Sequence, residues 1–595
     1  MNITLGLKRR SIKVFRRPER LWGAILLLAL LVFVVIPLIY IFIGSFQYDS
    51  WGPRYVRGAE PGNFTVFYWH RVLVSRMSTS IFWEPFLHSL LIAALVVLIS
   101  IPLGSMFAWL VVRTDLPCKK FFNSILIVPY ILPAWTVGLA WLTVFKNPQF
   151  GGQPGLLYGL FGIEPPVWVS YGLFPIVISL GIHYVPYTFT LLSGALTTID
   201  AQLEESAEIL GARRVRILTR ITFPLVLPAL GSAFILTVGR ALGAFGAPAF
   251  LGLPVRYYTL STRVYAAFSN RQQAEGYVLT VLLILFTTLT VLVNQKLLGT
   301  RKRFTTVTGK GGKRRLVKLG WWKILALLFM FGFVVLFVFA PLALVFLETL
   351  LRIEGCYTWD NLTLHYWIGF GVRELAEGQP GIFRNSVILG AIKNSVFLAL
   401  MTALVSGVLG VLIGYTVVRN RGKPISRALE SLSFVPYMIP GIAFGGIYLS
   451  LFARSWGPLP ALYGTMTILI ITCTMRNLPF AAGSGVASMH QIDVALEEAA
   501  ELHGVPWIKR FFRIILPLTK TGFLSAFLLT FITVMRALDE IALLVTPQTR
   551  TMTSIIFRFQ QQGFTQHAYG ITVLIVAITL IGSYLARRLG GRVSF

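Results

Sequence analysis

Residues 203–228 read LEESAEILGARRVRILTRITFPLVLP, and residues 496–521 read LEEAAELHGVPWIKRFFRIILPLTKT. The two segments align without a gap at a constant spacing of 293 residues, which places Gly211 on Gly504 and Pro224 on Pro517. Both segments are short, polar and helix-favouring, and both stand between long apolar runs. The repetition predicts a membrane protein that presents the same segment twice to a partner.

Each copy of this motif predicts two helices separated by a glycine turn. Glycine adopts the left-handed conformation that ends many helices, so Gly211 and Gly504 mark the turns. Proline lacks the N–H that continues a helix, so Pro224 and Pro517 are expected to end the second helix where the chain enters the membrane. The expected first helices are 202–210 and 495–503, and the second helices run to Phe223 and Leu516.

The charges of the motif favour a protein partner over a lipid surface. An amphipathic helix lying on the headgroups accounts for the basic residues, such as Arg213 and Lys509. It does not account for the acidic cluster of each copy, which anionic lipid repels. We therefore expect each helix to protrude into a groove of a soluble protein. The acidic residues are Glu204, Glu205 and Glu208, matched by Glu497, Glu498 and Glu501.

The rest of the chain reads as a series of membrane-spanning helices. Of its 595 residues, 55% are hydrophobic and 13% are charged, whereas a soluble domain averages about a quarter charged. Apolar runs of about 20 residues are long enough to cross a bilayer as helices. We expect an all-α membrane protein with about twelve spans, at 21–46, 86–112, 121–145, 167–196, 225–250, 277–298, 321–347, 387–418, 429–452, 459–483, 522–545 and 569–585.

The net charge of +30 follows the membrane topology and does not indicate nucleic-acid binding. Of the 53 basic residues, 35 lie in alternate gaps between spans, which is the positive-inside pattern. This pattern places both termini and both motif copies in the cytoplasm. The run 21–46 is too long for a signal peptide and is expected to remain as the first span. The basic gaps are 8–20, 113–120, 213–220, 296–323, 419–427, 509–520 and 587–592.

The repeat extends over two whole halves. The third spans carry Val128-Pro129-Tyr130 and Val435-Pro436-Tyr437, and the second spans end in Val111-Val112-Arg113 and Val417-Val418-Arg419. Because each half has an even number of spans, the halves are parallel repeats with a pathway on the axis between them. The expected units are a basic N-terminus (1–20), a first six-span domain (21–298), a basic cytoplasmic linker (299–320) and a second six-span domain (321–595).

The motif resembles the cytoplasmic signature of permease subunits of bacterial ATP-binding-cassette importers. That signature is Glu-Ala-Ala, three residues, Gly, nine residues and Ile-x-Leu-Pro. The second copy matches it in full, and the first has Ser206 for Ala and Phe223 for Leu. The matching residues are Glu498-Ala499-Ala500, Gly504 and Ile514–Pro517 in the second copy, and Glu205-Ser206-Ala207, Gly211 and Ile221–Pro224 in the first.

The resemblance implies a fused pair of permease domains that docks a dimer of ATPase subunits. It implies a multi-pass protein of the bacterial inner membrane, served by a periplasmic or lipid-anchored substrate-binding protein. It also implies that ATP and Mg²⁺ are bound by the ATPase and that this chain binds no cofactor or metal. The coupling residues are then Glu204, Glu205, Ala207, Gly211, Pro224, Glu497, Glu498, Ala500, Gly504 and Pro517.

The fused arrangement and the third-span prolines look most like the ferric-iron permease group. Close relatives of that group handle thiamine, phosphonates, sugar phosphates or polyamines, so the substrate stays open between ferric iron and these solutes. Basic residues in the outer gaps, such as Arg54 and Arg71, favour an anion or a metal carried with one.

Several polar residues at membrane depth are candidates for the pathway, because such groups are costly unless they face a cavity or a partner. For each of them a structural role is the alternative. His183 and Arg476 are equally explained as paired side chains, Arg536 as an internal salt bridge with Asp539 or Glu540, and the two tyrosines as packing. The candidates are His183, Tyr184, Arg240, Arg476, Asn477, Arg536, Glu540, Tyr130 and Tyr437.

Two other classes of protein are weaker interpretations. A self-sufficient secondary transporter of six plus six spans is compatible with the span count, but Asp539 and Glu540 are the only close acidic pair in any span. An enzyme is not supported, because the chain has neither a phosphate loop nor a catalytic or metal-ligating cluster.

Overall fold

The structure is a computed structural model, and it describes residues 18–150, 153–199, 201–299, 316–455 and 460–589. Nine of its helices are long and apolar enough to cross a membrane, and three bent helix pairs bring the number of spans to as many as twelve within the described residues. The prediction of an all-α membrane protein is confirmed. The expected basic N-terminus (1–20) and linker (299–320) fall largely outside the described residues.

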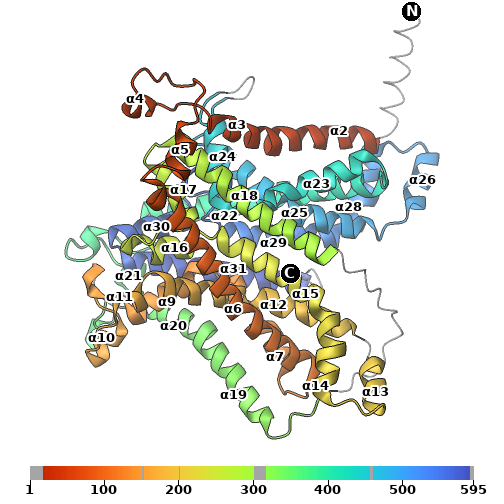
Figure 1. Cartoon of the computed structure of the whole chain (residues 1–595), viewed down its shortest axis with the longest axis horizontal. Helices are drawn as coiled ribbons and strands as arrows, with labels where there is room; N and C mark the ends of the chain where they lie inside the picture. Colours follow the sequence, from red (N-terminus) through yellow and green to blue (C-terminus); the bar gives the residue numbers. More distant parts are fainter. Residues whose placement is uncertain (1–17, 151–152, 200, 300–315, 456–459, 590–595) are drawn as a thin grey trace, which may run out of the picture.

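The first half supplies six spans in chain order (Figure 1). Their elements are α2, η1 and α3 (Pro18–Leu30, Leu31–Val35, Ile36–Gly44); η2 and α6 (Thr79–Trp83, Glu84–Arg113); α7, α8 and α9 (Lys119–Ile125, Val128–Ile131, Ala134–Phe145); α11 and α12 (Val167–Ser170, Leu173–Thr198); α14, η4 and α15 (Arg214–Ile217, Leu218–Thr222, Phe223–Leu242); and α18 (Gln273–Gly299).

The second half repeats this order. Its elements are α19, η6 and α20 (Trp322–Val334, Val335–Phe339, Ala340–Glu348); α22 (Ser386–Arg419); α23 and α24 (Pro424–Met438, Gly441–Phe452); α25 (Met466–Met489); α27, η9, α28 and α29 (Trp507–Arg510, Phe511–Ile515, Leu516–Leu518, Lys520–Met535); and α31 (Thr565–Leu589).

Five prolines follow a π-helical turn and leave the helix unbroken. They are Pro37, Pro85, Pro224, Pro341 and Pro517, and each is the second residue after its five-residue π-turn. The wider turn accommodates the missing N–H and the bulk of the proline ring. The expectation that Pro224 and Pro517 end their helices is therefore wrong. The helix runs on past Pro224 to Leu242, and it passes Pro517 before it breaks at Thr519.

The third spans bend sharply at their second proline. In the first half the axis turns by 87° between Ile131 and Ala134, and in the second half by 106° between Met438 and Gly441. Pro133 and Pro440 follow residues with extended backbone, because the residue before a proline is disfavoured in the helical region. Both bends lie midway along the span, so each exposes backbone carbonyls between the two halves.

Three expected spans end elsewhere. The expected span 225–250 stops at Leu242, and the glycine-rich segment after it contains a separate short helix, α16 (Gly246–Leu251). The expected span 522–545 stops at Met535, and 536–551 forms turns. The expected span 459–483 is shifted, because α25 begins at Met466 and ends at Met489. In the first two cases the apolar run continues past the helix, so hydrophobicity alone misplaced its end.

The first span of each half packs against the opposite half (Figure 1). Helix α2 lies against α22 and α23, and α20 lies against α9. At the first crossing, the Tyr448 hydroxyl donates a hydrogen bond to the carbonyl of Phe33 at 2.6 Å. Beside the second crossing, the Tyr569 hydroxyl of α31 donates to the carbonyl of Leu139 in α9 at 3.1 Å. The two halves are therefore interlocked, and neither buries its core alone.

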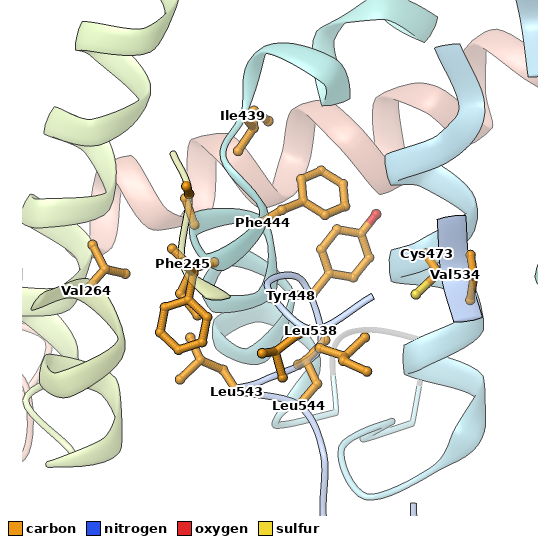
Figure 2. Packing of buried hydrophobic residues seen from close by; sticks show 14 of the residues in the cluster. Phe245, Val264, Ile439, Phe444, Tyr448, Cys473, Val534, Leu538, Leu543 and Leu544 are labelled. Carbon is orange, nitrogen blue, oxygen red and sulfur yellow. The ribbon is translucent and has the colours of Figure 1, made fainter. Parts of the chain in front are cut away.

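A shared apolar core joins the halves near their middle. Figure 2 shows Phe245 and Val264 of the first half packed with Leu538, Leu543 and Leu544 of the second. All five side chains are buried, and Phe245, Val264 and Leu544 are fully so. Burial of this size makes the contact between the halves a major source of stability.

Candidate functional site

The two copies of the motif lie at one end of the molecule, to the right in Figure 1, which we call the loop end. The first copy forms α13 (Ala201–Ile209), and the second forms α26 (Val494–Leu502). Each helix is closed by its glycine, since Gly211 has φ +80° and Gly504 has φ +70°. The short helix and the glycine turn agree with the predicted plan to within one residue.

In the first loop, Glu204 fastens α13 to the second span. The Glu204 carboxylate forms an ion pair with Arg113, the last residue of α6, and accepts a hydrogen bond from Thr222 Oγ1 at 2.7 Å. Arg113 is 6% exposed. The loop is thus anchored from two sides, by the second span and by the turn that leads into the fifth.

The second loop repeats this anchor in a more buried form. Glu497 is 7% exposed and accepts a hydrogen bond from Arg419 Nε at 2.9 Å. Arg510 adds an ion pair with Glu501 at 2.6 Å. Asp493 caps the helix, accepting a hydrogen bond from the Ala495 N–H at 3.0 Å.

These contacts change how the acidic residues are interpreted. Glu204 and Glu497 pair with arginines at the ends of the second spans and are largely withdrawn from a partner, whereas Glu501 pairs with Arg510 but keeps 63% of its side chain exposed. Glu205 is half-buried and Glu498 is exposed, and Ala207 and Ala500 are half-buried. Sequence reasoning missed Arg113 and Arg419 as the partners of Glu204 and Glu497, although both end the repeated Val-Val-Arg phrase.

Among polar neighbours, both loops expose large apolar side chains at their tips. Ile209 and Leu210 at the end of α13 are 85% and 87% exposed, and Leu502 at the end of α26 is 89% exposed. A single exposed apolar side chain is ordinary on a protein surface. Ile209 and Leu502, however, occupy the same position of the two aligned copies, and this repetition makes the two tips candidates for contact with a partner.

The nine predicted pathway residues line one cavity between the two halves. The cavity has a volume of 810 Å³ and is lined from both halves. Trp135, Tyr187 and Asp539 also line it and were not among the nine. Tyr187 lies one helical turn beyond His183, a spacing from which the sequence allowed its position to be inferred. Within the described residues, no group of three His, Cys, Asp or Glu residues is placed to hold a metal ion.

Arginine and tyrosine pairs cross between the halves in this cavity. The guanidinium of Arg240 lies 4.7 Å from the ring centre of Tyr437, and that of Arg536 lies 4.6 Å from the ring centre of Tyr130. Each arginine comes from a fifth span and each tyrosine from the bent third span of the opposite half. Cation–π contacts of this kind are favourable when the pair is removed from water.

The carbonyls freed at the bends are satisfied by the cavity's basic side chains. His183 Nδ1 lies 2.9 Å from the carbonyl of Pro129, and Arg476 bonds to those of Pro436 and Tyr437. Arg536 bonds across to the carbonyls of Tyr130 and Leu132 in the other half. The alternative of paired side chains thus describes both His183 and Arg476, and their partners are backbone carbonyls.

Arg240 and Arg536 stand in similar phrases, TVGRAL at 237–242 and TVMRAL at 533–538, which predict that the two arginines are equivalent. The helix ends show that they are not. Helix α15 ends at Leu242 with Gly243 as its cap, whereas α29 ends at Met535 with Arg536 as its cap. The structural equivalent of Arg536 is therefore Gly243. By the same alignment of the two halves, Asp539 corresponds to Gly246 and Glu540 corresponds to Ala247. No ion pair in the described chain joins Arg536 to either acid, so the expected internal salt bridge is absent.

The cavity reaches the loop end and is closed at the other. Gln491, three residues before α26, and Thr521 at the start of α29 are part of its lining. At the opposite end, the Phe245 ring is 5.8 Å from that of Phe557, and the Phe250 ring is 5.5 Å from it. These aromatic contacts between the halves seal the side away from the loops.

Residues 100–304 and 406–595 each match the family described as binding-protein-dependent transport system inner membrane component. Each match begins within the second span of its half and includes one loop and one set of cavity residues. Together the two matches cover well over half of the chain.

Individual proteins are similar over different lengths. The ferric transport system permease protein FbpB of Actinobacillus pleuropneumoniae is 28% identical over 96% of this chain and 79% of its own. The molybdenum transport system permease protein ModB of Escherichia coli is 36% identical over 28% of this chain and 69% of its own. A crystal structure of a bacterial ABC transporter involved in alginate import matches 45% of this chain and 96% of its own, with 19% identity and a TM-score of 0.35.

Proposed function

The chain belongs to the family of binding-protein-dependent transport system inner membrane components, and on that premise we propose which of its parts perform import. It is the permease subunit of a binding-protein-dependent importer and a multi-pass protein of the inner membrane. Its relatives are transport permeases and are not enzymes.

The two loops dock two copies of an ATP-binding-cassette ATPase, one for each loop. The observation that carries this proposal is the pair of exposed apolar tips at the same end of the molecule, Ile209 and Leu502. ATP and Mg²⁺ belong to the ATPase, and this chain binds no cofactor of its own. The ion pairs of Glu204 and Glu497 with the second spans transmit movement of the loops to the halves.

The cavity is the substrate pathway, and the structure corresponds to a state open toward the loops. Movement of the loops alternates this state with one open on the other side. In this proposal the loop end and both termini are cytoplasmic, which the distribution of basic residues supports. A soluble or lipid-anchored binding protein delivers substrate at the opposite end.

The proposed substrate is ferric iron or a small anionic solute. The similarity to the ferric transport permease over nearly the whole chain supports iron as the substrate. The shorter similarity to the molybdenum permease supports keeping other small solutes in the proposed class of substrates. In such systems the binding protein selects the substrate, so the ligand of the binding protein encoded beside this chain identifies it most directly.

A secondary transporter that needs no ATPase is the alternative. It requires ionisable groups in mid-membrane that couple an ion to the substrate, and Asp539 and Glu540 are the acidic residues of the cavity. Unaffected transport by the chain without any ATPase establishes this alternative.

The proposal is tested by binding of the ATPase to tip variants. Leu502→Asp and Ile209→Asp place a charge on each apolar contact, and we expect loss of co-purification with the ATPase and no loss of the folded chain. Trp359→Asp is the matched control, because Trp359 is 88% exposed in the far loop before the second span of the second half. The purified chain alone is expected to hydrolyse no ATP. Unchanged co-purification of both tip variants contradicts the proposal.

A further inference from the structure

Arg240 differs from the other two arginines of the cavity in having unused hydrogen-bond donors. Arg476 and Arg536 donate to backbone carbonyls at the bends of the third spans. In the described part of the chain Arg240 has neither a hydrogen bond nor an ion pair, and its buried Nε has no partner. Its guanidinium rests on the ring of Tyr437, with its N–H groups available to the cavity.

The nearby carboxylates do not neutralise this arginine. Asp539 and Glu540 line the same cavity, yet no ion pair among the described residues joins either to Arg240. The Asp539 carboxylate instead faces the backbone N–H groups of Phe245 and Gly246 at the start of α16. A partly buried guanidinium that faces a cavity with unused N–H donors and no anionic partner among the described residues is suited to bind an anion from outside the chain.

The position of Arg240 suits a ligand in transit. It lines both the main cavity and a second cavity of 300 Å³, and Tyr437, Arg476 and Asp539 line both as well. Arg240 and Arg476 come from different halves. An anion that is bound by both arginines therefore bridges the interface between the halves. A guanidinium presents its N–H groups in a planar fork that matches the oxygens of a carboxylate or a phosphate.

The same cavity is unsuited to a bare metal cation. It has three arginines against two carboxylates, and no group of three His, Cys, Asp or Glu residues in the described chain is placed to ligate a metal. A trivalent cation entering alone meets net repulsion in a site of low dielectric constant. An anionic oxygen ligand on the metal converts that repulsion into attraction.

We propose that Arg240 and Arg476 form an oxyanion site in the cavity, and that the transported species presents carboxylate or phosphate oxygens to it. This inference rests on the proposed role of the cavity as the pathway. The oxyanion comes either as a free solute or as the ligand shell of ferric iron, and the two sources share the same contact with the arginines.

The test is binding of labelled probes to the purified full-length chain in lipid nanodiscs, without ATPase or binding protein. The probes are inorganic phosphate, citrate and ferric citrate. We expect saturable binding that Arg240→Gln weakens at least about 10-fold, because hydrogen bonds to a charged group are lost. Arg240→Lys keeps the positive charge but lacks the planar fork of N–H groups, so its binding affinity is expected to lie between those of the wild type and Arg240→Gln. Arg57→Gln, which removes an exposed arginine of an outer loop, is expected to leave binding unchanged.

The outcomes separate the two sources. Binding of phosphate or citrate alone, lost in Arg240→Gln, assigns a free oxyanion, whereas binding of ferric citrate only, lost in the same variant, assigns an iron complex. Absence of binding by the wild-type chain overturns the oxyanion site. Equal binding by wild type and Arg240→Gln, with equal thermal unfolding midpoints, also overturns it. ATPase co-purification does not depend on these residues, so failure here leaves the docking proposal standing.

Discussion

The two loops share one anchor and differ in what supports it. In the first, Arg113 holds Glu204 with its side chain and accepts a hydrogen bond from the Val317 N–H through its carbonyl at 2.9 Å. Residues 113–115 and 317 form a short parallel bridge, closed by an ion pair between Lys323 and Asp115 at 2.6 Å. The end of the linker is thus bonded directly to the anchor of the first loop.

The second loop is supported by aromatic rings. Trp507 lies 5.4 Å from Trp22, 5.8 Å from Tyr415 and 5.1 Å from Phe511, measured between ring centres. The first span of the first half therefore contacts the second loop through Trp22, and the segment just before the first span of the second half bonds to Arg113, the anchor of the first loop. Because the first spans are exchanged, movement of either loop acts on both halves.

The largest expected difference between the loops concerns their anchor arginines. Arg419→Ala leaves Glu497 buried and unpaired, and we expect a loss of about 3 kcal/mol. Arg113→Ala is expected to cost about 1 kcal/mol, because the Glu204 side chain is 26% exposed against 9% for Glu497. Thermal unfolding in detergent measures both. The double variant Arg419→Ala/Glu497→Ala is expected to recover part of the lost stability. If the two single variants lose equal stability, the deeper burial of Glu497 does not make its ion pair more important than that of Glu204.

The two cavity arginines give the next largest contrast. Arg536→Gln leaves the carbonyls of Tyr130 and Leu132 without their donor, and we expect it to cost about 2 kcal/mol. Arg240→Gln removes no hydrogen bond to the chain, so it is expected to cost less than half as much. The unfolding midpoints of the ligand-free chain decide this, and a larger loss for Arg240→Gln contradicts the assignment of Arg240 to a ligand.

The aromatic support of the second loop has a smaller expected effect. Trp507→Ala is expected to cost about 1 kcal/mol and to speed amide hydrogen exchange in α26 while leaving α13 unchanged. Trp321→Ala is the control, since Trp321 is 65% exposed just before the first span of the second half. Exchange that rises equally in both loops shows that Trp507 supports the whole end of the molecule.

The linker bridge has the smallest expected effect and depends on pH. The ion pair with Lys323, together with the Leu319 N–H, lowers the pKa of Asp115. A lowered pKa in the folded state stabilises the bridge above the ordinary aspartate pKa of about 3.9, and this contribution is lost as the pH falls through the lowered value. Asp115→Asn is expected to speed exchange of the Val317 amide at pH 7. The wild type is expected to show the same change only in acid.

The sequence predicted the helical repeats, the glycine turns and the polar residues of the cavity, because hydrophobic runs, glycine and buried charge leave direct signals. It misplaced the ends of the fifth spans, since the apolar run continues past Leu242 and Met535. Aligning Arg240 with Arg536 because the surrounding residues are alike places the two arginines three residues away from their structurally equivalent positions. The correct alignment depends on where each helix ends, at the cap residues Gly243 and Arg536.

Long-range contacts were beyond the sequence. Arg113 and Glu204 stand 91 residues apart, and Arg536 bonds to residues of the other half more than 400 positions away. A single sequence contains no sign of such pairs beyond the repetition of the residues themselves. The packing of each first span against the opposite half likewise depends on contacts between distant residues, so no local sequence pattern predicts it.

The central claim is that each loop contacts its own copy of an ATPase, and site-directed cross-linking tests it most directly. Cys118 and Cys356 are exposed and are first replaced by serine, after which Ile209→Cys and Leu502→Cys introduce single thiols at the loop tips. The account predicts that each variant cross-links one ATPase copy and that the double variant carries two. Transport that continues while neither thiol cross-links to any ATPase contradicts it.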